Sequence, residues 1–127
     1  MSGLTVLGGE PMEPENQPGV LDLLQRVREK QPNCSLWLYS GFTYEELVGE
    51  IEVQPPYKIS PLTESTAGIL NLIDVLVDGP FIQDLYDIRL RFRGSSNQRI
   101  LDMKKSLREG KPCLFEFDER LSRPTAL

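Results

Sequence analysis

Cysteine is scarce in this 127-residue sequence, which contains only Cys34 and Cys113. The two lie 79 positions apart, a separation that matches neither a CxxC redox pair nor the ligand spacing of a zinc site. Residues 1–10 lack the basic stretch followed by an apolar stretch that is typical of an export signal. We therefore expect two reduced thiols rather than a disulfide or a metal site.

Long apolar runs are also absent, since no stretch of about 18 apolar residues is present to span a bilayer. The net charge of −5 disfavours general nucleic-acid binding. We expect a cytoplasmic protein with no membrane and no nucleic-acid partner. The charge is uneven, however: residues 1–88 carry four basic and 14 acidic side chains, whereas residues 89–127 carry ten basic and five acidic ones. The C-terminal third could therefore meet a phosphate, a carboxylate or an acidic protein surface.

The first half of the chain alternates between strand and helix patterns, in a composition typical of one globular domain. Apolar segments at 4–7 and 36–39 predict buried strands, and the second is apolar on both faces, as in a strand covered on both sides. A helix is expected to open near Pro18 and to stop at Pro32. The pair Thr43 and Glu46 forms a capping box, which predicts a helix from Tyr44 to about Ile51.

The second half is less regular. Residues 54–66 contain three prolines and predict a long surface loop with the character of an insertion. The remaining expectations are a short helix at 67–72, a strand at 73–78, extended structure at 89–93, a strand or a helix at 99–107, and a last strand at 114–117.

Strand–helix alternation is typical of a parallel sheet, in which ligands bind at the carboxyl ends of the strands. Three glycine-containing turns follow the predicted strands, and two of them carry a carboxylate: Gly8-Gly9-Glu10, Ser40-Gly41 and Asp78-Gly79. Glycine lets a ligand approach the backbone, and a carboxylate accepts hydrogen bonds from an ammonium or a hydroxyl group. Each turn alone is more typical of an ordinary turn than of a binding site, but a site formed by the three turns would be polar and anionic.

Four strings in order, LTVLGGEPMEPEN, SLWLYSGFTYEEL, LIDVLVDGPFIQDL and LRFRGSSNQRI, resemble the radical S-adenosylmethionine activases of anaerobic ribonucleotide reductase. The resemblance runs from Gly3 to about Leu107 and omits only the loop at 54–66. It implies an α/β fold, a parallel sheet with flanking helices that forms an incomplete radical-SAM-type partial (β/α) barrel without its first strand. This domain would cover residues 1–111, and residues 112–127 would form a C-terminal strand or a frayed tail.

The resemblance also assigns roles to the strand-end residues. Gly8, Gly9 and Glu10 match the turn that holds the amino group of S-adenosylmethionine, and Asp78 matches a position near the ribose or methionyl end of this cofactor. Ser40 and Gly41 would line the same rim. For the string RGSSNQ, a structural loop and a contact with cofactor or partner are equally compatible with the residues.

Members of this family hold a [4Fe–4S] cluster on three cysteines spaced CxxxCxxC, and this spacing is missing here. Cys34 and Cys113 cannot replace it, because two thiols from distant segments do not make up three ligands. We therefore expect either a truncated reading of a longer enzyme or a trimmed relative with a binding role.

By resemblance, the intact protein cleaves S-adenosylmethionine reductively and generates the glycyl radical of the anaerobic ribonucleoside-triphosphate reductase. Its partners would be the reductase and an electron donor such as flavodoxin or ferredoxin. The lack of histidine is compatible with this mechanism, which needs no acid–base dyad. The alternative is a non-catalytic interaction module or inactive fragment that binds the reductase or S-adenosylmethionine, with the basic stretch 89–99 docking on an acidic surface.

Overall fold

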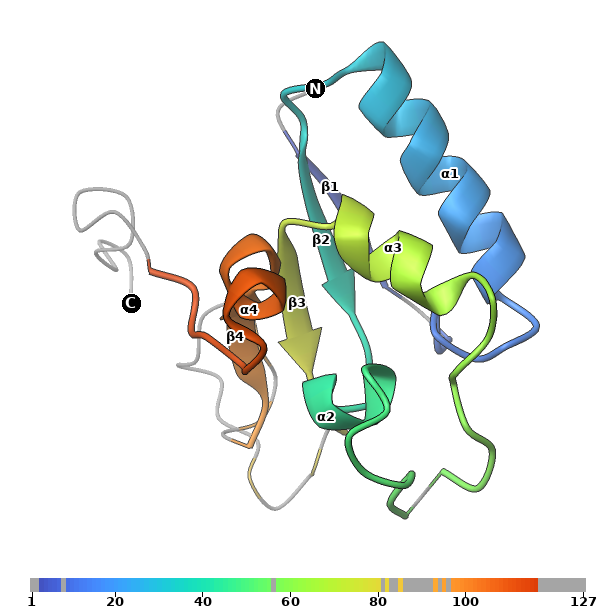
Figure 1. Cartoon of the computed structure of the whole chain (residues 1–127), viewed down its shortest axis with the longest axis vertical. Coiled ribbons are helices and arrows are strands. Elements are labelled where there is room, and N and C mark those ends of the chain that lie inside the picture. Colours follow the sequence, from blue (N-terminus) through green and yellow to red (C-terminus); the bar gives the residue numbers. More distant parts are fainter. Residues whose placement is uncertain are drawn as a thin grey trace.

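The fold is known from a computed structural model, which describes residues 3–7, 9–55, 57–80, 82, 85, 93, 95 and 97–116. Its centre is a four-stranded sheet in the order β1-β2-β3-β4 (Figure 1). The strands are β1 (Gly3–Val6), β2 (Ser35–Tyr39), β3 (Val75–Asp78) and β4 (Arg99–Asp102). The first three are parallel, as the alternation predicts, but β4 runs antiparallel to β3. The structure is therefore α/β with a mixed sheet rather than a purely parallel one.

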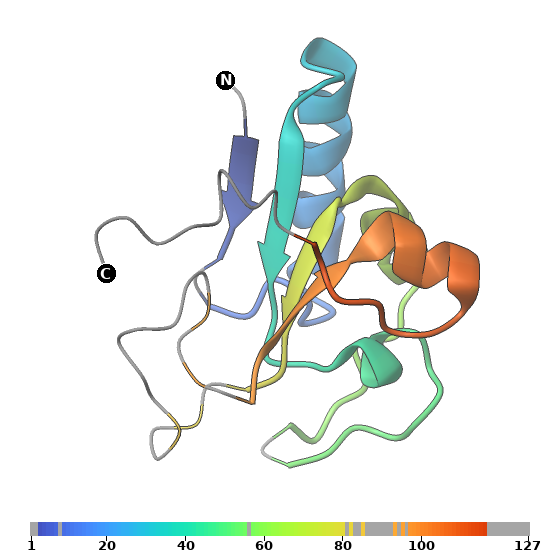
Figure 2. The same ribbon diagram turned by 90° about the vertical axis from the view of Figure 1, so that its left-hand side faces the viewer.

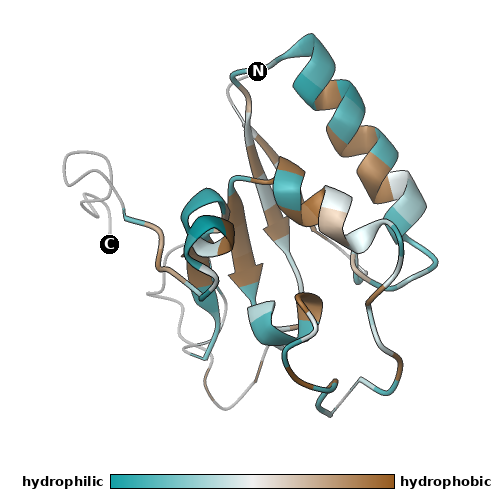
Figure 3. Ribbon diagram, in the orientation of Figure 1, coloured by the Kyte–Doolittle hydropathy of each residue, from teal (hydrophilic) through white to brown (hydrophobic). Residues whose placement is uncertain are grey.

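Helices cover one face of this sheet (Figures 1 and 2). They are α1 (Gln17–Lys30), α3 (Thr66–Leu72) and α4 (Met103–Glu109), and they bury Leu36 and Leu38 of β2 completely. On the opposite face Trp37 and Tyr39 are only half-buried, so the expectation of a strand covered equally on both sides is wrong for β2. Trp37 meets Phe115 there edge to face, with ring centroids 5.6 Å apart. The strand β3 is coloured as hydrophobic over most of its length (Figure 3).

The helices begin where the sequence places their start signals. Pro18 lies in the first turn of α1, where its missing N–H costs no hydrogen bond, and the chain leaves the helix before Pro32. In α2 (Tyr44–Leu47), both hydrogen bonds of the predicted capping box between Thr43 and Glu46 form. This helix is shorter than expected because Gly49 adopts φ +82°, which turns the chain away from the helix axis.

The segment 99–107 contains both of the structures that its sequence left open. It forms β4 and then α4, and Asp102 marks the change because its carboxylate accepts a hydrogen bond from the backbone N–H of Lys105. Further on, Leu114 makes only an isolated bridge to Leu101, so the described part of 114–117 is not a regular strand. Most of the extended structure expected at 89–93 lies outside the described residues.

Between α2 and α3 the described residues form neither helix nor strand, in agreement with the predicted loop at 54–66. Its far end is fixed to α1 by the buried Gln17. The amide nitrogen of Gln17 donates to the carbonyl of Pro61, and its amide oxygen accepts from the hydroxyl of Thr66. The near end of the loop is held by Tyr57, whose contacts are described with the functional site.

Candidate functional site

The three glycine-containing turns meet at the carboxyl ends of β1, β2 and β3. A cavity of about 210 Å³ lies between them, lined by Gly9, Glu10, Tyr39, Ser40, Gly41, Tyr57, Gly79 and Gln98. We call it the strand-end cavity. Gly8 lies outside the described residues, and the cavity includes Gly79 rather than its neighbour Asp78. Sequence reasoning missed Tyr39 and Tyr57 as site residues, whereas Gln98 belongs to the RGSSNQ string, for which a cofactor contact was left open.

Glu10 connects the ends of the first two strands. Its Oε2 atom accepts hydrogen bonds from the backbone N–H of Met12 at 3.0 Å and from the hydroxyl of Ser40 at 2.8 Å. Its Oε1 atom accepts from the N–H of Gly41 at 2.7 Å and from the hydroxyl of Tyr57 at 3.1 Å. An ionised carboxylate offers about four lone-pair sites, so every site of Glu10 has a donor from the chain. All four donors are neutral.

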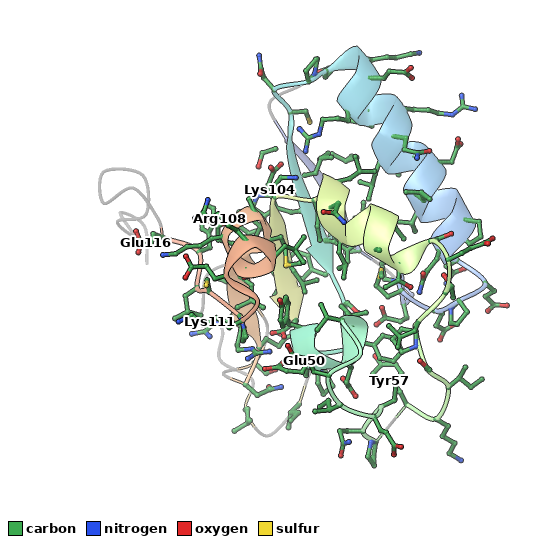
Figure 4. All side chains as sticks on the ribbon, viewed as in Figure 1. Glu50, Tyr57, Lys104, Arg108, Lys111 and Glu116 are labelled. Carbon is green, nitrogen blue, oxygen red and sulfur yellow. The ribbon has the colours of Figure 1, made fainter. Side chains whose placement is uncertain are left out.

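Tyr57 supplies the only one of these donors that comes from the 54–66 loop. Figure 4 shows its side chain beside α2, at the end of the sheet where β2 and β3 end. Its ring packs on Phe42 with centroids 4.1 Å apart, and it passes so close to Gly41 that a Cβ there would lie 1.8 Å from the tyrosine oxygen. Gly41 is therefore required by close approach and not only by a turn.

The hydroxyl of Tyr57 keeps the proton that it donates to Glu10. Burial, together with the nearby carboxylate of Glu10, raises the pKa of Tyr57 to about 12. The phenol consequently keeps its proton at neutral pH. Tyr57 also lines a second cavity of about 460 Å³, which we call the outer cavity. Its lining residues are Glu13, Pro14, Glu15, Phe42, Tyr57, Lys58 and Ile59.

Asp78 does not line the strand-end cavity and is 1% exposed. Its Oδ2 accepts a hydrogen bond from the N–H of Tyr44 at 2.8 Å, and its Oδ1 accepts from the guanidinium of Arg99 at 3.0 Å. Arg99 also pairs with Glu45 at 2.7 Å, and this hydrogen bond lowers the pKa of Glu45. Asp78 thus joins β3, the start of α2 and β4 in one ion-paired cluster.

Two residues of the RGSSNQ string form hydrogen bonds with the turn that follows β3. The side chain of Asn97 donates to the carbonyl of Pro80 at 2.7 Å, and that of Gln98 donates to the carbonyl of Gly79 at 3.0 Å. Gly79 itself has φ +97°, a conformation that favours glycine. For the described residues of the string, a structural role is therefore established, and Gln98 additionally lines the strand-end cavity.

Both cysteines have free thiols, as expected; Cys34 is buried and Cys113 is partly exposed. Within the part of the chain that the structure describes, no group of three or more His, Cys, Asp or Glu side chains is arranged to hold a metal ion. None of the described helices has the length and apolar character needed to cross a membrane.

Residues 1–101 match a protein family described as a 4Fe-4S single cluster domain. The chain belongs to this family. The match spans all three parallel strands, the strand-end cavity and most of β4, so the family likeness covers the candidate site.

The curated proteins that are similar to this chain share one name. The anaerobic ribonucleoside-triphosphate reductase-activating protein of Escherichia coli (strain K12) is 38% identical over 96 residues, which are 76% of this chain and 53% of the relative. The protein of that name from Vibrio cholerae serotype O1 is 42% identical over 98 residues, 77% of this chain and 54% of its own. The protein of that name from Enterobacteria phage T4 is 29% identical over 100 residues.

The chain spans about half the length of these curated relatives. No solved structure matches it.

Proposed function

We propose that this protein takes part in the activation of an anaerobic ribonucleoside-triphosphate reductase, as the part of a radical S-adenosylmethionine activase that binds the cofactor's methionyl end. The observation that carries the proposal is the strand-end cavity with its carboxylate, in a chain whose curated relatives are named as activating proteins of that reductase. A cytoplasmic location, and an electron donor such as flavodoxin or ferredoxin, belong to the same proposal and rest on the resemblance alone.

The arrangement of the sheet supports this assignment. Three parallel strands end at one edge, and the helices lie on a single face, as in a partial (β/α) barrel whose helices form the outer layer (Figure 2). The radical-SAM-type barrel therefore remains our interpretation of the first three strands, and the antiparallel β4 closes the sheet on the other side of β3.

The residues around the cavity fit an amino-acid group. Glu10 offers a carboxylate to an ammonium, and Gly9 and Gly41 expose backbone at the rim. None of the ion pairs among the described residues involves Glu10, so its negative charge is not neutralised by a basic side chain there. The volume of about 210 Å³ is smaller than the roughly 300–1,000 Å³ of typical ligand pockets, so it suits the methionyl part rather than a whole nucleoside cofactor.

We retain Gly8, Gly9, Glu10, Ser40 and Gly41 as the proposed binding residues. Ser40 would act through Glu10, because its hydroxyl donates to Oε2 and thereby orients the carboxylate. A direct contact of Asp78 with the cofactor does not fit, because Asp78 is paired with Arg99 and does not line the strand-end cavity. In our proposal Asp78 instead stabilises the structure next to the cavity, because its hydrogen bonds join β4 and the start of α2 to β3.

An iron–sulfur cluster does not fit the described residues, which contain two separate thiols and no grouped ligands. We derive no step of the reaction through it, and we expect this chain alone to be inactive as an activase. The shortage of thiols favours the alternative function, a non-catalytic module that binds the reductase. In that module the basic stretch 89–99 would dock on the reductase. Arg99 would not contribute to docking, because its side chain is already paired with Asp78 and Glu45.

Calorimetric titration of the purified chain with S-adenosylmethionine tests the proposal. We expect binding to the wild type and an affinity at least about tenfold lower for Glu10→Gln, because a charge-assisted hydrogen bond is lost. Glu29→Gln is the matched control, since Glu29 is exposed on α1 and remote from the cavity motifs. A thermal melt of each variant separates lost affinity from lost folding.

Equal affinity of Glu10→Gln and wild type, or no binding by the wild type, would overturn the cofactor site. A parallel measurement with the immobilised anaerobic reductase addresses the alternative. A chain that binds the reductase but not S-adenosylmethionine would be an interaction module.

A further inference from the structure

The carboxylate proposed to bind the cofactor's ammonium group has no vacant position for it. Its four lone-pair sites hold Met12, Ser40, Gly41 and Tyr57 as donors. A ligand ammonium can reach Glu10 in good geometry only if one of these donors leaves. The identity of that donor follows from how each one is held.

Three of the four donors belong to the framework. Met12 and Gly41 donate from the backbone, and Met12 is fully buried. Ser40 is 4% exposed, and its hydroxyl oxygen accepts a further hydrogen bond from the N–H of Phe42 at 3.1 Å. Moving any of them would disturb β2 or the turn after β1.

Tyr57 is held differently. Its neighbours along the chain, Gln54, Pro55, Lys58 and Ile59, are exposed, and Ile59 is 71% exposed. The far end of the loop is fixed separately through Gln17, so the middle of the loop can move without releasing α3. The side chain of Tyr57 is held by the stack on Phe42, by its hydrogen bond to Glu10 and by partial packing on the core. The backbone before it is anchored at Gln54, whose N–H donates to the carboxylate of Glu46, so displacing Tyr57 requires movement of the exposed residues that follow Gln54.

Tyr57 lines both the strand-end cavity and the outer cavity, so the two cavities adjoin at its side chain. The strand-end cavity alone is too small for a nucleoside cofactor, whereas the two cavities joined reach the usual size range of ligand pockets. Glu13 and Glu15 line the outer cavity and add negative charge on the path of a cationic ligand.

We propose that Tyr57 is a displaceable plug of the cofactor site: its hydroxyl holds Oε1 of Glu10 in the ligand-free protein, and the α-ammonium group of S-adenosylmethionine replaces it. The exchange is favourable at Glu10 because the ammonium carries a positive charge and forms an ion pair with the carboxylate, whereas the phenol of Tyr57 is a neutral donor. When the ring leaves Gly41, the two cavities join to admit the rest of the ligand. This inference rests on the proposed function and adds to it a residue that controls access.

The first test compares the affinity of wild type and Tyr57→Phe for S-adenosylmethionine by calorimetric titration. The variant keeps the ring but has no hydroxyl to displace, so we expect it to bind about threefold to tenfold more tightly. Tyr44→Phe is the matched control, because it removes a hydroxyl that donates to the carbonyl of Ser106 in the core and does not line the cavity. Its affinity should equal that of the wild type.

The second test follows the position of the loop by limited proteolysis. Trypsin cleaves after the exposed Lys58, next to Tyr57, so the rate of cleavage there reports the position of the loop. We expect S-adenosylmethionine to accelerate cleavage at Lys58 in the wild type, and we expect Tyr57→Phe to be cleaved faster than the wild type without any ligand. Slower cleavage with the ligand would show that Tyr57 clamps the cofactor instead, and would overturn the plug.

The outcomes distinguish the two proposals. If the wild type binds S-adenosylmethionine, Glu10→Gln does not, and Tyr57→Phe binds no more tightly than wild type, then the plug is wrong and the proposed function stands. If neither wild type nor Tyr57→Phe binds, the cofactor site itself is wrong and the plug falls with it.

Discussion

Two carboxylates follow parallel strands of this sheet, Glu10 after β1 and Asp78 at the end of β3, and their surroundings differ in one decisive respect. Asp78 is buried against a guanidinium, which neutralises it. Glu10 accepts four hydrogen bonds from neutral donors and is half-buried beside a cavity. Satisfied hydrogen bonding therefore does not distinguish Asp78 from Glu10, the carboxylate that we propose to bind the cofactor. Charge compensation does, since of these two carboxylates only Asp78 is paired with a basic side chain among the described residues.

Asp78→Asn tests the structural half of this comparison and should have the largest effect. The change removes the charge that compensates Arg99 and should lower the free energy of unfolding by about 2–4 kcal/mol, less than for a fully buried pair because Arg99 is 33% exposed. Urea denaturation measures this loss. For comparison, Glu10→Gln should lower the free energy of unfolding by only about 1–2 kcal/mol, because the hydrogen-bond partners of Glu10 are neutral. Equal losses in the two variants would remove the distinction.

Gly41→Ala tests the binding half, with a smaller effect. The new Cβ would collide with the hydroxyl of Tyr57, so the loop must move and lose both the Glu10 hydrogen bond and the Phe42 stack. We expect a loss of about 1–2 kcal/mol in urea denaturation, together with faster tryptic cleavage after Lys58. Gly19→Ala is the control, since nothing lies within 4 Å of its Cβ position in α1, and it should be stabilising by about 0.5–1 kcal/mol. Unchanged cleavage in Gly41→Ala would mean that Tyr57 is not displaced.

Glu45→Gln sharpens the account of the Arg99 cluster and should have the smallest effect. The hydrogen bond from Arg99 lowers the pKa of Glu45 from its usual 4.5. The resulting stabilisation is present above that usual pKa and is lost as the pH falls through the lowered one. In acid-dependent urea denaturation, the wild type should therefore lose stability below about pH 4.5 more steeply than Glu45→Gln, by less than about 1 kcal/mol. Identical slopes would mean that the Arg99–Glu45 pair contributes nothing.

Local patterns predicted most of the elements correctly because their causes are local. Pro18 and Pro32 bound α1, and Thr43 and Glu46 start α2, through contacts within a few residues. The length of α2 was overestimated because the positive φ of Gly49 is a backbone property that the side-chain pattern does not display. The antiparallel direction of β4 could not be predicted from its local sequence either, since strand direction depends on how the chain returns to the sheet.

For the candidate site, the glycine and carboxylate turns were predicted, but their partners were not. The alternation of strands and helices is enough to place Gly9, Ser40 and Gly79 at one edge, because parallel strands all end on the same side. Tyr57 lies 47 positions from Glu10, and Arg99 lies 21 positions from Asp78. Which carboxylate receives a phenol and which a guanidinium depends on the paths of a loop and an antiparallel strand. Those paths are chosen by packing across the whole domain, so this division of roles is visible only in the folded chain.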